Sequence, residues 1–205
     1  MNLIILLVFF LGSTEIAANQ RFFDYLEGVE SLESDFLQET LSDEGVVLET
    51  SRGYLKIKKP GMFKLLYSSP FIQEIISNGD RIWIYDPDLQ QVVVRETFDS
   101  EVSFLNLILK NPIALEENYI VKSLTEGNGL NEKFLLVASE GSSTVFRRVY
   151  VSFSNELISG FQLKAGVDRI LEIRLNNVKK NTEIDAREFE FIPPENADVI
   201  NGVSR

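Results

Sequence analysis

The stretch RIWIYDPDLQQVVV, residues 81–94, contains two short apolar segments joined by a tight turn. The tripeptide DPD supplies turn-forming residues, and the alternation on both sides of it predicts a β-hairpin. In the first strand Trp83 and Tyr85 alternate with Ile82 and Ile84, so both faces carry large apolar groups. Such a sheet needs a cover on each face, and the chain offers few helices to provide it.

The same alternation recurs along most of the chain. GVVLETSRGYLKIKKP predicts a long strand in which Leu55, Ile57 and Lys59 share one face. Short, turn-rich connections separate further predicted strands at 62–67, 71–77, 119–124, 133–139, 145–153, 157–164 and 169–178. The expected fold is therefore mainly β, an incomplete antiparallel β-barrel or strongly curved sheet. Residues 19–205 are expected to form a single domain.

Two segments predict helices. Residues 19–30 place apolar side chains near helical spacing, and residues 101–110 (EVSFLNLILK) do so more densely. The second helix leaves only a narrow polar stripe, whereas a surface helix usually has a narrower apolar face. Its apolar residues are Val102, Phe104, Leu105, Leu107, Ile108 and Leu109. This helix therefore needs apolar neighbours on more than one side.

The interior of the curved sheet can be occupied either by side chains of the strands or by a ligand. The strand side chains can fill it themselves, and the pattern slightly favours this interpretation. Otherwise a concave apolar surface is left over for a ligand, with helix 101–110 as a movable cover.

Composition narrows the function. The chain has no Cys and no His, which removes disulfides, thiol nucleophiles, imidazole-based triads and Cys or His metal sites. An enzyme is therefore not expected, and neither is a cofactor or metal. The net charge of −11 disfavours binding to nucleic acid and electrostatic docking to an anionic membrane.

The N-terminus predicts export. Residues 3–11 form an apolar run too short for a bilayer, which needs about 20 residues. Small residues at Ala17 and Ala18 suit signal-peptidase cleavage, so residues 1–18 are interpreted as a signal peptide, although no Lys or Arg precedes the run. The rival interpretation is a short buried helix.

Lys59 ends the strand face that carries Leu55 and Ile57, which puts a charge at the rim of the expected interior. The usual explanation is a side chain that reaches solvent at a strand end. The alternative is a donor that binds carbonyl groups of the covering helix and latches it.

Four stretches in order resemble one known family, the periplasmic outer-membrane lipoprotein carrier family LolA. They are SDFLQET (34–40), GYLKIKKPGMFKL (53–65), ISNGDRIWIYDPDLQQVVV (76–94) and FEFIPPENADVI (189–200). The resemblance implies a half-closed barrel with a helical lid. Its hydrophobic cavity would take up the acyl chains of lipoproteins.

The resemblance also implies site residues and partners. The cavity and its mouth would be formed by Leu55, Ile57, Phe63, Leu65 and Trp83, and the lid face by Phe104, Leu105, Ile108 and Leu109. The expected partners are lipoproteins, an inner-membrane lipoprotein-releasing transporter and an outer-membrane acceptor, with the protein itself a periplasmic monomer. The family's acceptor carries a lipid-modified Cys, which this chain lacks.

Two positions depart from the family pattern. Lys59 stands where the family typically has an Arg that bonds the lid, and Lys lacks the planar fork of Arg, so the latch would be weaker or differently made. Leu65 stands where the family commonly has Trp. The alternatives to a lipoprotein carrier are a related acyl- or glycolipid-binding module and an envelope sensor or scaffold of the same fold.

Overall fold

The computed structural model describes residues 12–95, 112–125, 130–142, 144, 146–164 and 168–202. Its helices are α1 (Gly12–Glu27), α3 (Pro112–Asn118) and the short 3-10 helix η1 (Ala186–Phe189). Its strands are β1 (Ser31–Ser42), β2 (Val47–Lys58), β3 (Met62–Ser69), β4 (Gln73–Asn78), β5 (Ile82–Asp86), β6 (Gln91–Arg95), β7 (Tyr119–Ser123), β8 (Asn131–Ala138), β9 (Arg148–Ser154), β10 (Leu157–Lys164), β11 (Arg169–Lys180) and β12 (Asp198–Asn201). No helix within these ranges is both long and apolar enough to cross a membrane.

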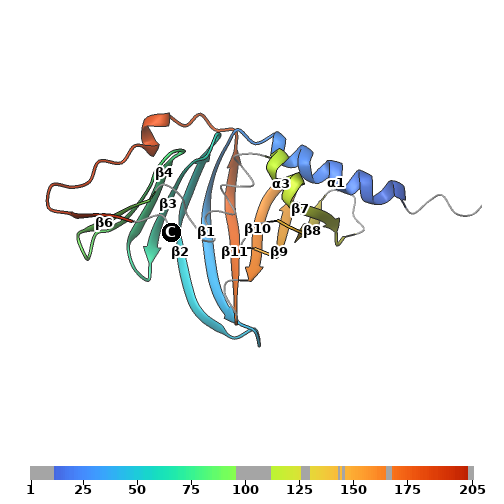
Figure 1. Cartoon of the computed structure of the whole chain (residues 1–205), viewed down its shortest axis with the longest axis horizontal. Helices are drawn as coiled ribbons and strands as arrows, with labels where there is room; N and C mark the ends of the chain where they lie inside the picture. The colour runs from blue at the N-terminus through green and yellow to red at the C-terminus, as the bar shows by residue number, and fades with distance from the viewer. Residues whose placement is uncertain are drawn as a thin grey trace, which may run out of the picture.

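The twelve described strands form one open sheet, in the order β12-β6-β5-β4-β3-β2-β1-β11-β10-β9-β8-β7 (Figure 1). Strands β1 to β6 pair antiparallel with their neighbours in the chain, as do β7 to β11, and β1 joins these two halves by pairing with both β2 and β11. The described exception to antiparallel pairing is β12, which runs parallel to β6 at the edge. The prediction of a mainly β, mostly antiparallel open sheet with an N-terminal helix is confirmed.

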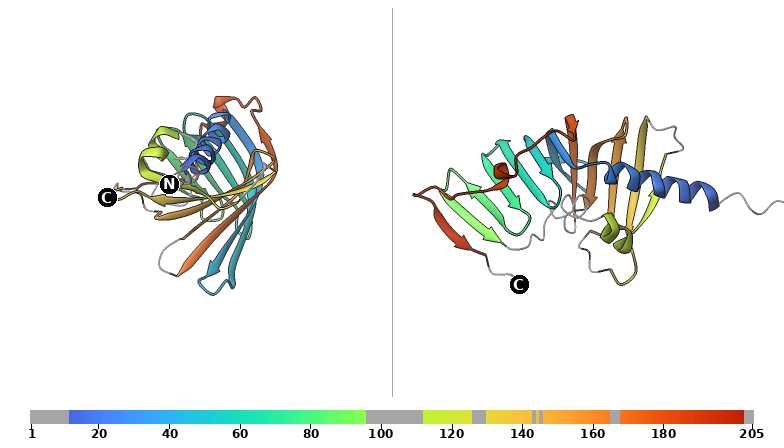
Figure 2. Two further views of the ribbon diagram at one scale, coloured as in Figure 1. Left: turned by 90° about the vertical axis from the view of Figure 1, so that its right-hand side faces the viewer. Right: turned by 90° about the horizontal axis from the view of Figure 1, so that it is seen from above.

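One face of the sheet is concave and carries α1 and α3 (Figure 2). Because side chains alternate along each strand, neighbouring strands contribute apolar residues to this face in rows. The first row across β2–β5 consists of Leu55, Leu65, Ile75 and Ile84. The second consists of Ile57, Phe63, Ser77 and Ile82. The buried apolar residues of these rows belong to the main hydrophobic core, and Ser77 is a buried polar member of the second row.

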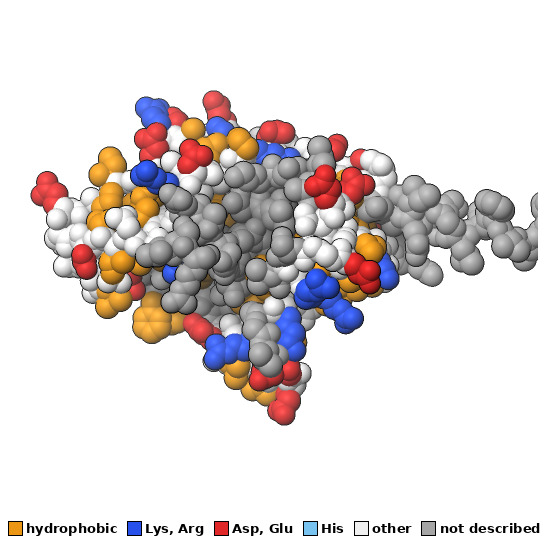
Figure 3. All heavy atoms as spheres, in the orientation of Figure 1, with side chains coloured by type: hydrophobic (Ala, Val, Ile, Leu, Met, Phe, Trp, Pro, Cys, Tyr) orange, Lys and Arg blue, Asp and Glu red, His pale blue; other side chains and the backbone are white. Residues whose placement is uncertain are grey.

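The outer surface mixes both signs of charge. In Figure 3, Asp and Glu side chains are interspersed with Lys and Arg side chains over the visible face, and exposed hydrophobic side chains gather towards the β6 end. Exposed hydrophobic residues of this end include Leu89, Val199 and Ile200. Leu89 lies in the turn between β5 and β6, and Val199 and Ile200 belong to the edge strand β12.

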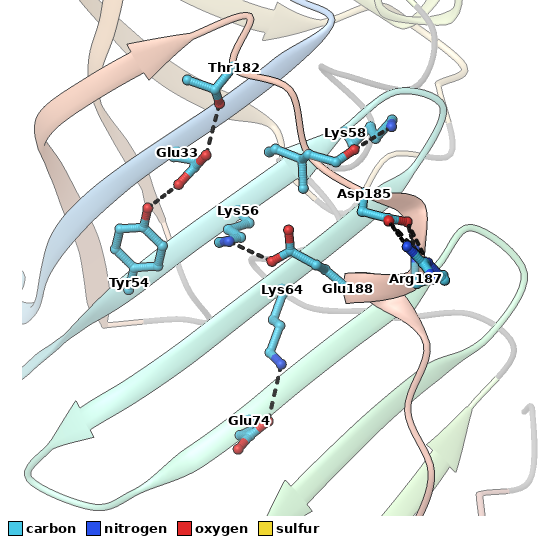
Figure 4. A network of polar contacts seen from close by, with 11 residues as sticks. Glu33, Tyr54, Lys56, Lys58, Lys64, Glu74, Thr182, Asp185, Arg187 and Glu188 are labelled. Carbon is cyan, nitrogen blue, oxygen red and sulfur yellow. Dashed lines mark hydrogen bonds and ion pairs between the residues drawn. The ribbon is translucent and has the colours of Figure 1, made fainter.

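The convex face of β2–β5 is covered by residues 181–197, named here the C-terminal strap (Figure 4). Lys56 Nζ binds the Glu188 carboxylate at 2.6 Å, and Lys58 Nζ donates to the Ile184 carbonyl oxygen at 2.5 Å. η1 packs against β3 and β4, and Ile76 of β4 is buried on this face. The strap therefore covers the second apolar face of residues 81–94.

A polar contact at the base of the strap leads to a pH-dependent prediction. The Tyr54 hydroxyl donates to the Glu33 carboxylate, which also accepts from Thr182 Oγ1 at 2.9 Å. The bond from Tyr54 lowers the pKa of Glu33, and burial followed by the bond to Glu33 raises the pKa of Tyr54 to about 12. We expect Tyr54→Phe to lower the free energy of unfolding by about 1 kcal/mol at neutral pH.

The sign of each pKa shift sets the pH range of this loss. A lowered carboxyl pKa stabilises the fold above the ordinary Glu pKa, and that stabilisation is lost as the pH falls through the lowered value. A raised Tyr pKa stabilises the fold below pH 10.0, and that stabilisation is lost as the pH rises towards about 12. Urea unfolding across this range should give a flatter profile for Tyr54→Phe. Tyr85→Phe, which keeps its ring beside Phe191, is the control; an equal effect in both would contradict the prediction.

Three elements differ from the sequence-based expectation. β1 was not predicted as a strand, although it is central to the sheet. α3 and β12 were also not predicted. The predicted helix 101–110 lies outside the described residues. Strand β10, by contrast, begins and ends at the predicted residues 157 and 164.

Candidate functional site

Four of the predicted cavity residues lie together on the concave face. Leu55 and Ile57 of β2 are direct cross-strand neighbours of Leu65 and Phe63 of β3. Each of these side chains is at most 4% exposed. The antiparallel turn at Pro60-Gly61 sets this register, because it returns the chain with the apolar residues of both strands on the same face. The result is a continuous apolar wall.

Trp83 does not join this wall. It is the cross-strand partner of Ile76, and the two lie on the convex face. The centroid of its ring system is 6.3 Å from that of Phe191 in the C-terminal strap, and the ring of Tyr85 is 5.6 Å from the same residue. In the structure Trp83 therefore anchors the strap. The residues of β5 that face the wall are Ile82 and Ile84.

Two further residues extend the wall to β1, and sequence reasoning missed them. The Phe36 ring lies edge-on to the Tyr67 ring, with 5.0 Å between centroids. Both flank Gly53, which pairs with each of them across the sheet. The available signal was the glycine inside a predicted strand, which often marks a close approach of neighbouring groups.

The predicted lid residues Phe104, Leu105, Ile108 and Leu109 lie outside the described residues. Their role as a cover over the wall stays a prediction.

Lys59 binds carbonyl groups of a helix, and that helix is α1. Its Nζ donates to the Leu26 carbonyl oxygen at 3.0 Å and to the Glu27 carbonyl oxygen at 3.4 Å. The last turn of α1 has no basic residue of its own, so Lys59 supplies the cation that favours a helix C-terminus. Burial lowers the pKa of the Lys59 ammonium, and Glu30 and Glu27 oppose that shift. A contact between Lys59 and residues 101–110 stays a prediction.

Replacing Lys59 tests its hold on α1. We expect Lys59→Met to lower the free energy of unfolding by about 1–2 kcal/mol, because two carbonyl groups lose a charged donor. Amide hydrogen exchange in residues 19–27 should accelerate. The control is Lys58→Met, which removes a bond to the C-terminal strap and should affect strap residues instead. Unchanged exchange in residues 19–27 of Lys59→Met would contradict this role.

Known proteins are similar to this chain in sequence and in fold. Residues 27–192 match the family described as "Outer membrane lipoprotein carrier protein LolA". This chain belongs to the outer-membrane lipoprotein carrier family. An outer-membrane lipoprotein carrier protein of Chromohalobacter salexigens is 34% identical over 177 residues, which cover 85% of this chain and 82% of that protein. An outer-membrane lipoprotein carrier protein of Alkalilimnicola ehrlichii is 33% identical over 177 residues, which cover 86% of this chain and 80% of that protein.

A solved structure agrees with the fold alone. An uncharacterized conserved protein from Thermus thermophilus superposes with a TM-score of 0.58 at 12% identity, covering 90% of this chain and 99% of that one. The match to the lipoprotein carrier family includes β1–β11, and with them the apolar wall on the concave face. Carriers of this family are transport proteins and not enzymes.

Proposed function

We propose that this protein is a periplasmic carrier that binds the acyl chains of lipoproteins on its concave face and shuttles the lipoproteins from the inner to the outer membrane. The observation that carries the proposal is the apolar wall of β2–β5, which continues through four neighbouring strands. Family membership supports the same function. An inner-membrane releasing transporter and an outer-membrane acceptor would be its partners, with the carrier acting as a monomer.

The chemistry of acyl chains explains why a carrier needs such a wall. Moving an acyl chain from a membrane into water costs about 0.8 kcal/mol per CH₂ group, so a free lipoprotein does not cross an aqueous space unaided. A wall of branched aliphatic side chains offers the chain a dry surface without specific polar contacts. This lack of specificity suits a carrier with many different cargo proteins, because the acyl chains are what it recognises.

The carrier must also release its cargo. A movable cover at residues 101–110 would present Phe104, Leu105, Ile108 and Leu109 to the wall when cargo is absent. Phe63 at the mouth would contact the cargo or the releasing complex. When cargo binds, its acyl chains replace the apolar face of the cover on the wall. One apolar contact is lost as another is gained, so the net affinity for cargo stays moderate.

Adjacent leucines on β3 provide a matched test. Leu65 faces the wall, and Leu66 lies on the convex face. Leu65→Asn places an amide on the acyl-binding surface, and an unpaired buried amide costs about 1–3 kcal/mol. We expect release of a membrane-anchored lipoprotein into solution to fall about tenfold or more, since each 1.4 kcal/mol is tenfold in affinity.

Leu66→Asn is the control, and it should release nearly as much lipoprotein as the wild type. Both variants are first compared by circular dichroism and urea unfolding, so that a folding defect is separated from a binding defect. If wild-type protein releases no lipoprotein, the proposed carrier function fails. If it binds acyl-chain probes but releases no lipoprotein, it is a lipid-binding module with another passenger.

A further inference from the structure

The end of the concave face near β8 and β9 is filled by aromatic side chains from α1. Phe22 packs edge-on against Phe134 of β8 and Phe153 of β9, with 5.2 Å and 5.9 Å between ring centroids. The ring of Tyr25 lies 4.9 Å from that of Phe153. Phe22 and Phe134 have no exposed surface. Figure 1 shows α1 running along this end of the sheet. The protein's own rings therefore occupy the surface that strands β8 and β9 offer.

A buried carboxylate ties α1 to the same end. Glu132 of β8 is 2% exposed and shares the inward-facing side of its strand with Phe134. Its Oε1 accepts from Arg21 Nε at 3.1 Å, and its Oε2 accepts from the Tyr25 hydroxyl at 2.9 Å. Both donors belong to α1. Burial raises the pKa of the Tyr25 phenol, and the bond to Glu132 raises it further, so this donor keeps its proton.

The position of Glu132 makes α1 costly to move. A charged group inside a protein is tolerated when it is paired and hydrogen-bonded, and removing its partners leaves an uncompensated buried charge. Lifting α1 away from β8 would remove both described partners of Glu132 at once. It would also separate Phe22 from two rings. The helix is thus held by a charged contact and an aromatic contact that act together.

The β2–β5 half of the same face has a different character. Its rows are mainly aliphatic, with Phe63 as an aromatic member and the Phe36–Tyr67 ring pair beside them. Among the described residues, α1 and α3 pack against β7 and against each other. α1 meets β2–β5 at its C-terminal end, where Lys59 binds its last carbonyl groups. Within the part of the chain that the structure describes, no buried carboxylate ties either helix to this half.

We infer that the concave face is divided into a closed half and a cargo half. α1 is a fixed plug over β8 and β9, Glu132 is the positioning residue that holds it there, and acyl chains lie against β2–β5 alone. This inference rests on the proposed carrier function and adds where on the concave face the acyl chains bind. It also separates α1 from any cover that opens for cargo.

Photolabelling of the unmodified protein tests the division. The probe is a synthetic diacylated lipopeptide that carries a diazirine at the end of each acyl chain. Trypsin yields peptide 65–81 from β3 and β4 and peptide 134–147 from β8. We expect labelling of 65–81 and little labelling of 134–147. Equal labelling of both peptides would overturn the division while leaving the carrier function intact. Absence of specific labelling from every peptide would count against the carrier function itself.

The role of Glu132 is tested by Glu132→Gln, which keeps the shape of the side chain and removes its charge. We expect amide exchange in residues 19–27 to accelerate by about tenfold to a hundredfold and labelling to spread into 134–147. Glu74→Gln, which weakens an ion pair with Lys64, is the control for a lost carboxylate and should leave the label on 65–81. Unchanged exchange and unchanged labelling in Glu132→Gln would overturn the positioning role.

Discussion

Phe22→Ala should lower the free energy of unfolding by about 3–5 kcal/mol, which is the usual range for removing a fully buried phenylalanine. Phe22 has no exposed surface, and its ring contacts the rings of Phe23, Phe134 and Phe153. Alanine would leave a cavity among these rings, and the two strands that carry Phe134 and Phe153 are too firmly paired to collapse into it. Since a domain is stable by about 5–15 kcal/mol in total, this single change removes a large share. Urea unfolding measures it.

The neighbouring phenylalanine provides the control. Phe23 is only half-buried and contacts Phe22 edge-on, with 5.4 Å between centroids. Phe23→Ala should cost less, about 1–2 kcal/mol, because part of this side chain already faces solvent and less apolar surface is lost. Equal losses from Phe22→Ala and Phe23→Ala would show that the aromatic cluster does not anchor α1. The comparison therefore measures how much of the fold's stability comes from the docking of this helix.

The hairpins could be predicted from the sequence because their determinants are local. In residues 76–94, turn residues lie between segments that alternate with a period of two, and β4, β5 and β6 pair accordingly. The same pattern placed Leu55 and Ile57 on one face of their strand, and in the structure these two residues pair with Leu65 and Phe63 of β3. Local pattern is enough here because each strand's neighbour in the sheet is also its neighbour in the chain.

β1 was missed because its side chains do not alternate clearly between apolar and polar. Polar groups occur on both sides of the strand, and Glu33 is bonded on the convex face by Tyr54 and Thr182. A register shift between Glu33 and Asp35 further interrupts the period of two. β1 is a strand because β2 and β11 pair with it on either side, and β11 lies far along the chain. Such non-local pairing is invisible in a short window of sequence.

The surroundings of two site residues, Trp83 and Lys59, depend on distant segments in the same way. Alternation separates Trp83 from Ile82 and Ile84, but it does not say which face is concave. The C-terminal strap decides this, since Phe191 packs beside Trp83 on the convex face. For Lys59, the predicted chemistry of a donor to helix carbonyls is present in the structure. The identity of the helix could not be inferred from the strand that carries the lysine.

Glu132 was overlooked although its strand carries a usable signal. In β8 the residues Glu132, Phe134 and Leu136 alternate on the buried face. A carboxylate in an apolar row predicts a buried partner, because an unpaired buried charge is strongly unfavourable. The partners, Arg21 and Tyr25, are one turn apart on α1, which is the spacing that places both side chains on one helix face. The pairing could therefore have been proposed from sequence once α1 was assigned.

Gly53→Ala should be the most damaging glycine substitution near the cargo half, with an expected loss of about 2–3 kcal/mol in the free energy of unfolding. A Cβ atom at Gly53 would lie 2.1 Å from the Leu66 carbonyl oxygen and 2.6 Å from Cζ of Phe36. The Phe36 ring could rotate, but the Leu66 oxygen is backbone and moves only if β3 moves with it. Such a shift would disturb the register that aligns Leu65 with Leu55.

The stability lost in Gly53→Ala comes from a steric clash. Gly141 is a matched control at which a substitution loses stability only through backbone conformation. Gly141 has a φ of +77°, and a Cβ there would meet no atom within 4 Å. Gly141→Ala should therefore cost only about 1 kcal/mol, from the backbone strain of a left-handed residue. It should leave lipoprotein release unchanged, whereas Gly53→Ala should reduce release because the wall is displaced. If the two variants unfold at the same urea concentration and release equal amounts of lipoprotein, the close packing of Phe36 over Gly53 does not shape the acyl-binding wall.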